Sequence, residues 1–199
     1  MSPKVSAEYM LQRRREILDA ATKVFSQKGF HAATLDDVAT EAEISKGSIY
    51  IHFDSKEAMI DGLSERWQTI DDEVFDAAEA MPRAIDGVTY IVKATIRRSQ
   101  RSDFGDSARL GMFVWAEVLI NPAVAKSQAL LGEKWNRRFH ALVERAKDDG
   151  DIRPTFTVDS VIMFLGSLGG GFFLSRVWDA KPNVADAEKL IDAFISSLR

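Results

Sequence analysis

The segment from Glu43 to Ile60 alternates polar side chains with apolar ones in a way that suits molecular recognition. Lys46 carries a cation, Ser48 a hydroxyl group, and Tyr50 and His52 carry polar groups on aromatic rings. Cations and hydroxyl groups contact phosphate oxygens, whereas hydroxyl and methyl groups contact base edges. These residue types favour a surface that reads nucleic acid, provided that one element presents them together.

A helix that begins after Ser45 would present them together. At 100° per residue, Ile49 and Phe53 lie on one side of such a helix and face a core. The opposite side, with Gly47, Ser48 and Ile51, would meet base edges. Phosphates would be contacted from the flanks by Tyr50 and His52 and from the ends by Lys46 and Lys56.

Two further helices are predicted before this one. Apolar residues at helical spacing run through Tyr9–Lys28, and Gly29 is placed to end that helix in a left-handed conformation. Thr34 is a favourable N-cap, and Asp37 three residues later forms a near capping box. A turn of about three residues then leads to Ser45. One long and two short helices in this order are typical of a helix-turn-helix.

Charge leaves the function open at this point. The net charge is −4, with −1 in residues 1–60, so DNA binding would depend on a few well-placed cations. Arg13, Arg14 and Arg15 form one basic cluster, although such a triplet on a helix is more often simply a solvated face. A three-helix bundle needs no DNA, so periodicity alone supports DNA binding and a plain bundle equally.

The order of residues adds a resemblance. The segment from Arg14 to Leu63 closely resembles the DNA-binding domain of the TetR family of bacterial transcriptional regulators, through AATKVFSQKGF, Thr34, the Val38-Ala39 pair and SKGSIYIHFDSKEAM. The resemblance implies phosphate contacts by Thr34 and Lys56 and a recognition helix between them. The expected DNA-binding residues are Thr34, Ser45, Lys46, Gly47, Ser48, Tyr50, Ile51, His52 and Lys56.

Glu43 departs from the family pattern, which usually has glycine in this turn. A non-glycine residue in a left-handed turn costs on the order of 1 kcal/mol, and phosphate repels a carboxylate. We therefore expect either a slightly different turn or a Glu43 side chain that points away, with a modest loss of stability and DNA affinity.

The rest of the chain is expected to be helical. A long helix from Ser55 to about Met81 would link the two parts, and five more are predicted at Ala84–Ser102, Asp106–Ile120, Ala123–Asp149, Val158–Asp179 and Val184–Leu198. The expected fold is all-α with about nine helices. The resemblance implies a helix-turn-helix DNA-binding domain at 1–54 and a helical effector-binding and dimerisation domain at 55–199.

Two sets of residues in the second part are candidates for binding. Most of the first set is more typical of a core, and residues of the second set could equally belong to the core. An effector cavity implied by the resemblance could be lined by Trp67, Met112, Phe113, Trp115, Phe164 and Phe172, with Glu117 as a partner for a cationic ligand. A dimer interface across a two-fold axis could use Val161, Leu165, Leu168, Leu190, Phe194 and Leu198. The glycines at 166 and 169–171 could allow close packing, make room for a ligand or break the helix.

Several classes of function find no support. The chain has no cysteine, and no catalytic or metal-binding motif is present. We expect no enzyme activity, no cofactor and no metal site. The longest apolar segment, 11 residues from Met163, is too short for a membrane span, and a cytoplasmic location is expected.

The sequence thus predicts a homodimeric, ligand-responsive transcriptional regulator, a repressor that a small-molecule effector releases from operator DNA. The alternative is a helical small-molecule or protein-binding module whose N-terminal domain binds DNA weakly or not at all.

Overall fold

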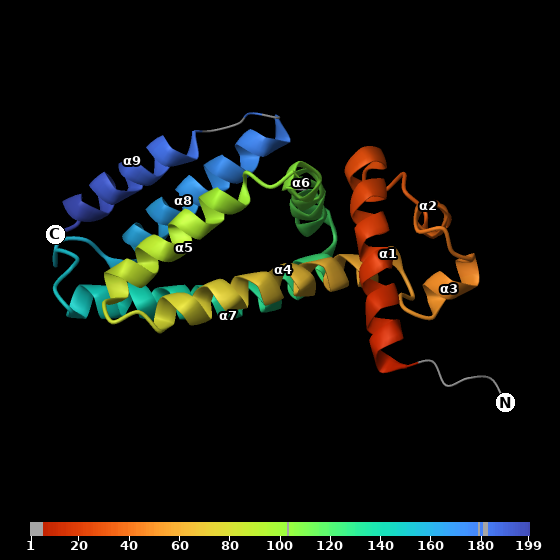
Figure 1. Cartoon of the computed structure of the whole chain (residues 1–199), viewed down its shortest axis with the longest axis horizontal. Helices are drawn as coiled ribbons and strands as arrows, with labels where there is room; N and C mark the ends of the chain where they lie inside the picture. The colour runs from red at the N-terminus through yellow and green to blue at the C-terminus, as the bar shows by residue number, and fades with distance from the viewer. Residues whose placement is uncertain (1–5, 103, 179, 181–182) are drawn as a thin grey trace. The chain divides into compact units, whose positions relative to one another are not determined.

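The computed structural model describes residues 6–102, 104–178, 180 and 183–199, the side chains of residues 68 and 70 excepted. This described part is all-α, with nine helices and no strand (Figure 1). The helices are α1 Ala7–Lys28, α2 Leu35–Glu41, α3 Lys46–Tyr50, α4 Lys56–Glu79, α5 Ala84–Arg98, α6 Phe104–Ile120, α7 Pro122–Asp148, α8 Val158–Val177 and α9 Val184–Ser197. The predicted fold class is confirmed.

The packing divides the chain into two compact units. Unit 1 consists of Met1–Arg66 and Arg109–Gln128, and unit 2 of Trp67–Ala108 and Ala129–Arg199. Helices α4, α6 and α7 therefore each have residues in both units. The predicted domain boundary lies after residue 54, where the helix-turn-helix motif ends. Unit 1 is larger than that motif, because it also contains the start of α4 and most of α6.

In unit 1, α2 packs against α1 and α3 packs against α2, and Figure 1 shows both short helices on the same side of α1. The stripe predicted along α1 is buried and includes Ile17, Leu18, Ala21, Val24 and Phe25. The next three helices also contribute buried residues to unit 1, among them Val38, Ile49, Met59 and Leu63. This core holds the two short helices, which are too short to be stable alone.

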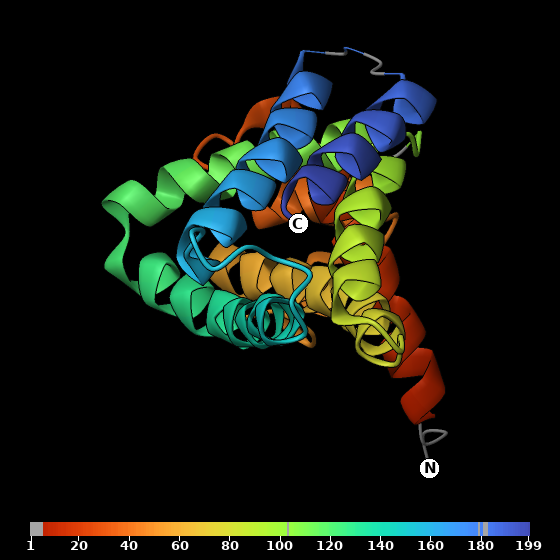
Figure 2. The same cartoon turned by 90° about the vertical axis from the view of Figure 1, so that its left-hand side faces the viewer.

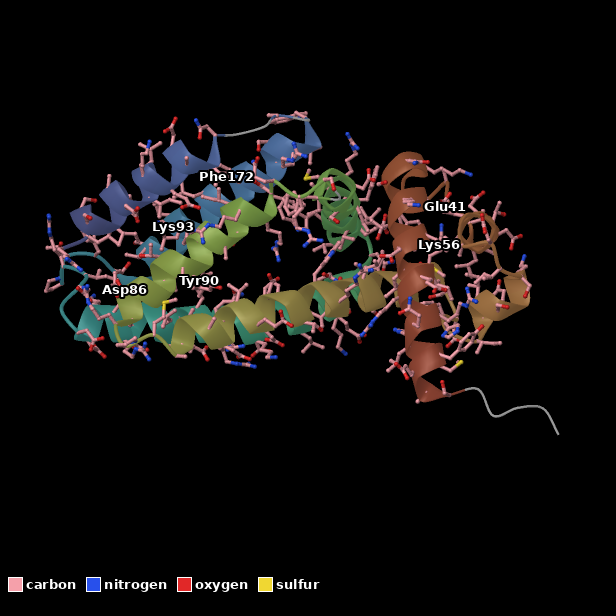
Figure 3. The ribbon with its side chains drawn as sticks, in the orientation of Figure 1. Glu41, Lys56, Asp86, Tyr90, Lys93 and Phe172 are labelled. Carbon is pink, nitrogen blue, oxygen red and sulfur yellow. The ribbon has the colours of Figure 1, made fainter. Side chains whose placement is uncertain are left out.

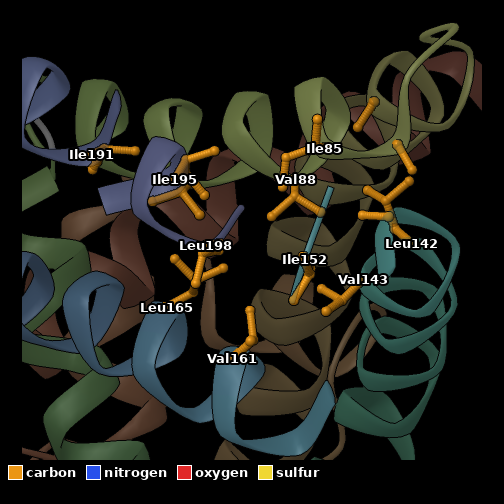
Figure 4. Packing of buried hydrophobic residues seen from close by; sticks show 14 of the residues in the cluster. Ile85, Val88, Leu142, Val143, Ile152, Val161, Leu165, Ile191, Ile195 and Leu198 are labelled. Carbon is orange, nitrogen blue, oxygen red and sulfur yellow. The ribbon is translucent and has the colours of Figure 1, made fainter. Parts of the chain in front are cut away.

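In unit 2, α5 packs against both α8 and α9, and the three helices lie side by side in both views (Figure 1, Figure 2). Their apolar faces and part of α7 form one core (Figure 4). It includes Ile85, Val88, Leu142, Val143, Ile152, Val161, Leu165, Ile191, Ile195 and Leu198. Ile152, in the connection after α7, also packs into this cluster.

Helix bounds differ from the prediction at some ends. Helix α5 ends at Arg98 rather than Ser102, because the buried Ser99 caps it and donates its hydroxyl hydrogen to the Ile96 carbonyl at 2.6 Å. Helix α7 begins at Pro122, a favoured first position, since proline has no N–H to leave unpaired there. The predicted end of α8 at Asp179 lies outside the described residues.

Helix α8 is apolar on all sides. It is long and apolar enough to cross a membrane by length and composition, and so is the bent pair formed by α6 and α7. One or two such helices are weak evidence for a membrane span, because core helices pass the same test. However, only 11% of the apolar window of α8 is buried in this chain. The helix therefore presents an extended apolar surface without a partner inside the described part of the chain.

Candidate DNA-binding surface

The start of α2 is held by a complete capping box. Thr34 accepts a hydrogen bond from the Asp37 N–H at 3.1 Å, and its own N–H and hydroxyl donate to Asp37 Oδ2, both at 2.9 Å. Hydrogen bonds from Lys28, first, and from Thr34 lower the pKa of Asp37 to about 2. A phosphate oxygen only accepts, and the single hydroxyl proton of Thr34 is already used. The predicted phosphate contact of Thr34 therefore requires this bond to Asp37 to break.

The turn between α2 and α3 is closed by a Schellman motif centred on Glu43. The Glu43 N–H donates to the Thr40 carbonyl at 3.2 Å, and the Ile44 N–H donates to the Ala39 carbonyl at 3.0 Å. Glu43 has a φ of +54°, a value that costs an L-residue about 1–2 kcal/mol. The turn is therefore left-handed, and Glu43, which is exposed, occupies the position at which glycine is usual.

Helix α3 begins at Ser45, which accepts a hydrogen bond from the Ser48 N–H at 3.2 Å. Ile49 and Phe53 are buried as predicted. Tyr50 and Ile51 are exposed, and the exposed surface continues through Ser45, Lys46 and Gly47. A side chain at Gly47 would meet only the Ser45 hydroxyl, at 3.9 Å, so packing within the chain does not require glycine here. A glycine here leaves room for another molecule to approach the α3 backbone closely.

Most cations around this surface are engaged in exposed ion pairs. Lys46 pairs with Asp36 at 2.8 Å, and Lys28 pairs with Asp37 at 2.7 Å. Pairs of this kind contribute roughly 0–1 kcal/mol, so phosphate oxygens can replace the carboxylates at little cost. Arg15 is exposed and makes no ion pair or hydrogen bond with the described residues. It is the member of the arginine triplet most available to DNA.

Lys56 has a different role from the one expected. Its side chain is labelled in Figure 3. The ammonium group donates to the carbonyl groups of Phe30, His31 and Ala33, at 2.7, 3.2 and 2.9 Å. It also lies 4.8 Å from the centroid of the Phe30 ring. An ammonium group has three donors, and all three are used within unit 1. Lys56 thus closes the α1–α2 connection, and it has no donor left for a phosphate in this arrangement.

Arg14 and His52 form a contact that the sequence did not predict. Arg14 donates to the His52 carbonyl at 2.9 Å, and its guanidinium lies 4.1 Å from the centroid of the Phe53 ring. Burial, first, and then the charges of Arg14 and Arg13 lower the pKa of His52. These surroundings favour the uncharged imidazole of His52 in the free protein.

Glu117 also has a different partner from the one expected. Glu117 is 97% buried, and its carboxylate Oε1 lies 2.7 Å from His31 Nε2. Both residues belong to unit 1, where His31 lies in the α1–α2 connection and Glu117 in α6. The role predicted for Glu117, to neutralise a cationic ligand, is not supported, because the carboxylate already joins α6 to the DNA-binding helices. The sequence offers no local signal for this contact between distant segments.

The other residues predicted to line an effector cavity do not gather in one unit. Met112, Phe113 and Trp115 belong to unit 1, whereas Trp67, Phe164 and Phe172 belong to unit 2. Phe113 lies against Gly29, whose φ of +76° and ψ of 160° define a conformation restricted to glycine. Phe164 stacks on Phe194 with 4.4 Å between centroids. Phe172 lines a shallow depression on α8 together with Ser167, Leu168, Gly171 and Ser175.

The residues predicted at a dimer interface fall into two groups. Val161, Leu165 and Leu198 are at most 3% exposed inside the core of unit 2, so they cannot contact a partner. Leu190 is exposed, whereas Leu168 and Phe194 are half-buried at the edge of that core. The exposed apolar side chains on these helices, which the prediction left out, include Met163. The apolar stripes of α8 and α9 were predicted correctly, but Val161, Leu165 and Leu198 on these stripes face the core of unit 2.

Comparisons with known proteins agree with this geometry. Residues 17–63, which contain α2, α3 and parts of α1 and α4, match the model of the family described as bacterial regulatory proteins, tetR family. The HTH-type transcriptional regulator UidR of Escherichia coli K12 is 33% identical over 150 residues, which cover 71% of this chain and 69% of UidR. The HTH-type transcriptional repressor KstR2 of Rhodococcus jostii is 28% identical over 159 residues, or 77% of this chain and 74% of KstR2.

A solved structure shares the whole fold. The transcriptional regulator FadR of Bacillus subtilis, in complex with stearoyl-CoA, superposes with a TM-score of 0.76 at 15% identity, covering 93% of this chain and 98% of FadR. The helix-turn-helix with its matching family segment, and a relative of 33% identity over most of both chains, establish the relationship. This chain belongs to the TetR family of bacterial DNA-binding transcriptional regulators.

Proposed function

We propose that this protein is a homodimeric repressor that binds operator DNA through α3 and is released when a small-molecule effector binds unit 2. The observation that carries the proposal is the exposed surface of Ser45, Lys46, Gly47, Tyr50 and Ile51 on α3. The Ser45 cap, the Schellman turn and the buried pair Ile49 and Phe53 hold this surface in place without DNA. A preorganised surface loses little conformational entropy on binding.

Dimerisation follows from the small reach of a single helix. One recognition helix contacts only a few base pairs, whereas two helices spaced by one turn of DNA read two half-sites. The exposed apolar side chains of α8 and α9, such as Met163, Phe164 and Leu190, supply a surface that a second copy would cover. The glycines of α8 have open space beside them, apart from Gly169, and would let a partner helix approach closely.

Release by an effector requires a connection between the units. Helices α4, α6 and α7 each continue from one unit into the other. Within unit 1, α6 and α7 are tied to the DNA-binding helices by His31–Glu117 and by the Ser127 hydroxyl, which donates to Asp61 at 2.6 Å. An effector that favours a different arrangement of these helices would weaken DNA binding, and DNA would weaken effector binding by the same factor. The stearoyl-CoA complex of FadR shows that one protein of this fold holds a ligand.

The proposal needs no catalytic step, cofactor or metal ion, and it places the protein in the bacterial cytoplasm with its DNA. A repressor and an activator would present the same DNA-binding surface. The direction of regulation therefore has to be measured separately from DNA binding.

Fluorescence anisotropy with labelled DNA tests the proposal directly. DNA from upstream of the protein's own gene and random DNA of the same length are titrated at several salt concentrations. We expect tighter binding to the upstream DNA, with an affinity that falls as salt rises because phosphate contacts release counterions. Equal affinity for the upstream DNA and the random DNA, together with a genome-wide selection that returns no bound fragment, would exclude the proposed regulatory function. That result would favour a small-molecule or protein-binding module that has lost DNA recognition.

A matched pair of variants makes the test specific. Tyr50→Ala changes the exposed surface of α3, whereas Tyr90→Ala removes the same side chain from unit 2, against its core. Tyr50→Ala should reduce affinity for the upstream DNA about tenfold. Tyr90→Ala, if folded by circular dichroism, should leave that affinity within about twofold. Equal losses in both variants would contradict a direct role for α3.

A further inference from the structure

Three buried side-chain nitrogens in the described part of the chain have no hydrogen-bond partner. They are Arg98 Nε, Trp135 Nε1 and Arg176 Nε. All three are donors, and all three belong to unit 2. Leaving a buried donor unpaired costs about 1–3 kcal/mol, so such groups usually have a partner such as a bound molecule. The interior of unit 2 therefore has spare donors, which calls for a ligand that accepts hydrogen bonds.

Arg98 leaves unused the side of the guanidinium that most often holds carboxylates. Its Nη1 donates to Asp71, the only partner of Arg98 among the described residues. Two other arginines of unit 2 use the edge formed by Nε and Nη2 to hold a carboxylate with two bonds. Arg97 holds Glu188 in this way at 2.6 and 3.0 Å, and Arg138 holds Glu79 at 2.7 and 2.8 Å. On Arg98 the Nε of that edge is buried and unpaired.

Arg98 can hold a second carboxylate beside Asp71. Arg138 provides the precedent, because its guanidinium contacts Asp72 and Asp76 as well as Glu79. Burial, first, raises the pKa of Asp71, although Arg98 opposes this effect. The surroundings of the pair are therefore poorly hydrated, and ionic hydrogen bonds are stronger there than in water.

Trp135, on α7, packs against α4 at Phe75, one helical turn after Asp71. Its ring stacks on Phe75 with 6.4 Å between centroids and 29° between planes. Phe75 follows Asp71 by four positions on α4, so the two side chains are neighbours on one helix face. Arg98, bound to Asp71, and Trp135, stacked on Phe75, thus present an ionic donor and a neutral donor beside an aromatic wall.

We propose that unit 2 binds a small organic carboxylate at the Nε edge of Arg98. The indole Nε1–H of Trp135 donates the additional hydrogen bond, and the ring of Trp135 contacts the apolar body of the ligand. This inference rests on the proposed effector-regulated function and names the chemical class of the effector. A cationic ligand is disfavoured at this position, because every spare group there is a donor and one of them is itself a cation.

NMR titration of the full-length protein with benzoate tests the site, and benzamide is the neutral control of the same shape. The resonances to follow are the Nε–H of Arg98 and the indole Nε1–H of Trp135, assigned by substitution. We expect benzoate to shift both resonances in a saturable way and benzamide to shift neither at the same concentration. If benzoate leaves both resonances unmoved up to tens of millimolar, roughly the limit for one charged contact of a few kcal/mol, the site does not exist.

Two conservative variants separate the site from general effects on folding. Trp135→Phe keeps an aromatic ring on Phe75 but removes the donor, and it should weaken benzoate binding about three- to tenfold. Arg98→Lys keeps a cation opposite Asp71 but removes the planar edge, and it should weaken binding at least about tenfold. Arg97→Lys, at the adjacent position, should leave benzoate binding unchanged. Unchanged binding in the first two variants, or an equal loss in the third, would overturn the proposal.

Benzoate binding is measured without DNA, so the outcome does not depend on the operator experiment. A protein that binds benzoate at Arg98 but shows no DNA specificity would retain the site and lose the proposed regulatory function. A protein that binds its operator but does not respond at Arg98 would retain the regulatory function and lose this site.

Discussion

Lys46 and Lys56 lie at the two ends of the recognition segment but have different partners. Lys46 pairs with the exposed Asp36, whereas Lys56 donates to three backbone carbonyl groups between α1 and α2. A phosphate can replace a carboxylate on the surface, but it cannot replace three carbonyl groups without opening the connection between two helices. Lys46 is therefore free to exchange Asp36 for a phosphate in the proposed DNA complex, whereas Lys56 is committed to the connection between α1 and α2.

Alanine at each position should reveal this difference. Lys56→Ala should lower the free energy of unfolding by about 1–3 kcal/mol, because it leaves backbone carbonyl groups without their charged donor. Lys46→Ala should change that free energy by less than about 0.5 kcal/mol and reduce the salt dependence of DNA binding by about one phosphate contact. Urea unfolding and anisotropy measure the two effects. Lys23→Ala, which removes another exposed ion pair, is the control for both.

Glu43 stores strain in the turn before the recognition helix. Glu43→Gly should raise the free energy of unfolding by about 0.5–1 kcal/mol, because glycine adopts a φ of +54° without steric cost but loses more entropy on folding. Glu43→Ala keeps the strain and removes the carboxylate, so it should not stabilise the protein. Thermal unfolding of the three proteins measures the difference. Equal stabilisation by alanine and glycine would show that the charge of Glu43, rather than its conformation, is unfavourable.

At the scale of elements, the two short helices depend on their ends. Helix α2 has seven residues and α3 has five, and each begins at a hydroxyl side chain that accepts from an N–H three positions later. Isolated helices of this length do not form in water, so caps and packing on α1 supply their stability. These caps are local in sequence, which explains why both helix starts were predicted correctly.

The capping box makes α2 sensitive to acid. The pKa of Asp37 is lowered to about 2, below its usual value of about 3.8, so its stabilising effect is complete above about pH 4. That effect should decrease as the pH falls and vanish near pH 2, where the folded state also takes up the proton. The unfolding free energies of the wild type and Asp37→Asn should therefore differ at pH 6 and converge near pH 2. A difference that persists undiminished at pH 2 would contradict an electrostatic role for Asp37.

At the scale of the whole molecule, the apolar surface of α8 and α9 is the feature that a single chain leaves unexplained. Met163 is 74% exposed and Leu190 is 71% exposed, although both lie on helices that also carry the core of unit 2. A helix that is apolar all round is usually buried. A second copy of the chain would bury this surface and would provide the second recognition helix that operator binding requires.

Charged substitutions on this surface should dissociate the dimer. The double variant Met163→Asp and Leu190→Asp should be monomeric at micromolar concentration by analytical ultracentrifugation, because an unpaired carboxylate cannot be buried cheaply. Its operator affinity should fall at least about a hundredfold through loss of the second half-site. Leu130→Asp, at another exposed position in unit 2, should leave the protein dimeric. A dimeric double variant would place the interface elsewhere.

The sequence by itself determined the helices, the caps at Thr34 and Ser45, the inward positions of Ile49 and Phe53, and the family resemblance. Each of these depends on residues within about one or two helical turns, so periodicity and capping rules are sufficient to predict it. Side chains of the second part were harder to assign, because an apolar stripe has the same spacing whether it faces the core or a partner. The spacing of Val161 and Leu165 in the sequence, for example, is the same as that of residues in an interface stripe.

Only the tertiary structure decided the partners of the charged and polar side chains. Lys56 meets the α1–α2 carbonyl groups, Glu117 meets His31, and Arg98 meets Asp71 across segments that are distant in sequence. Burial removes water from such groups, so their roles depend on which donor or acceptor the fold brings within hydrogen-bonding distance. That choice is made by the packing of whole helices, which no local pattern contains.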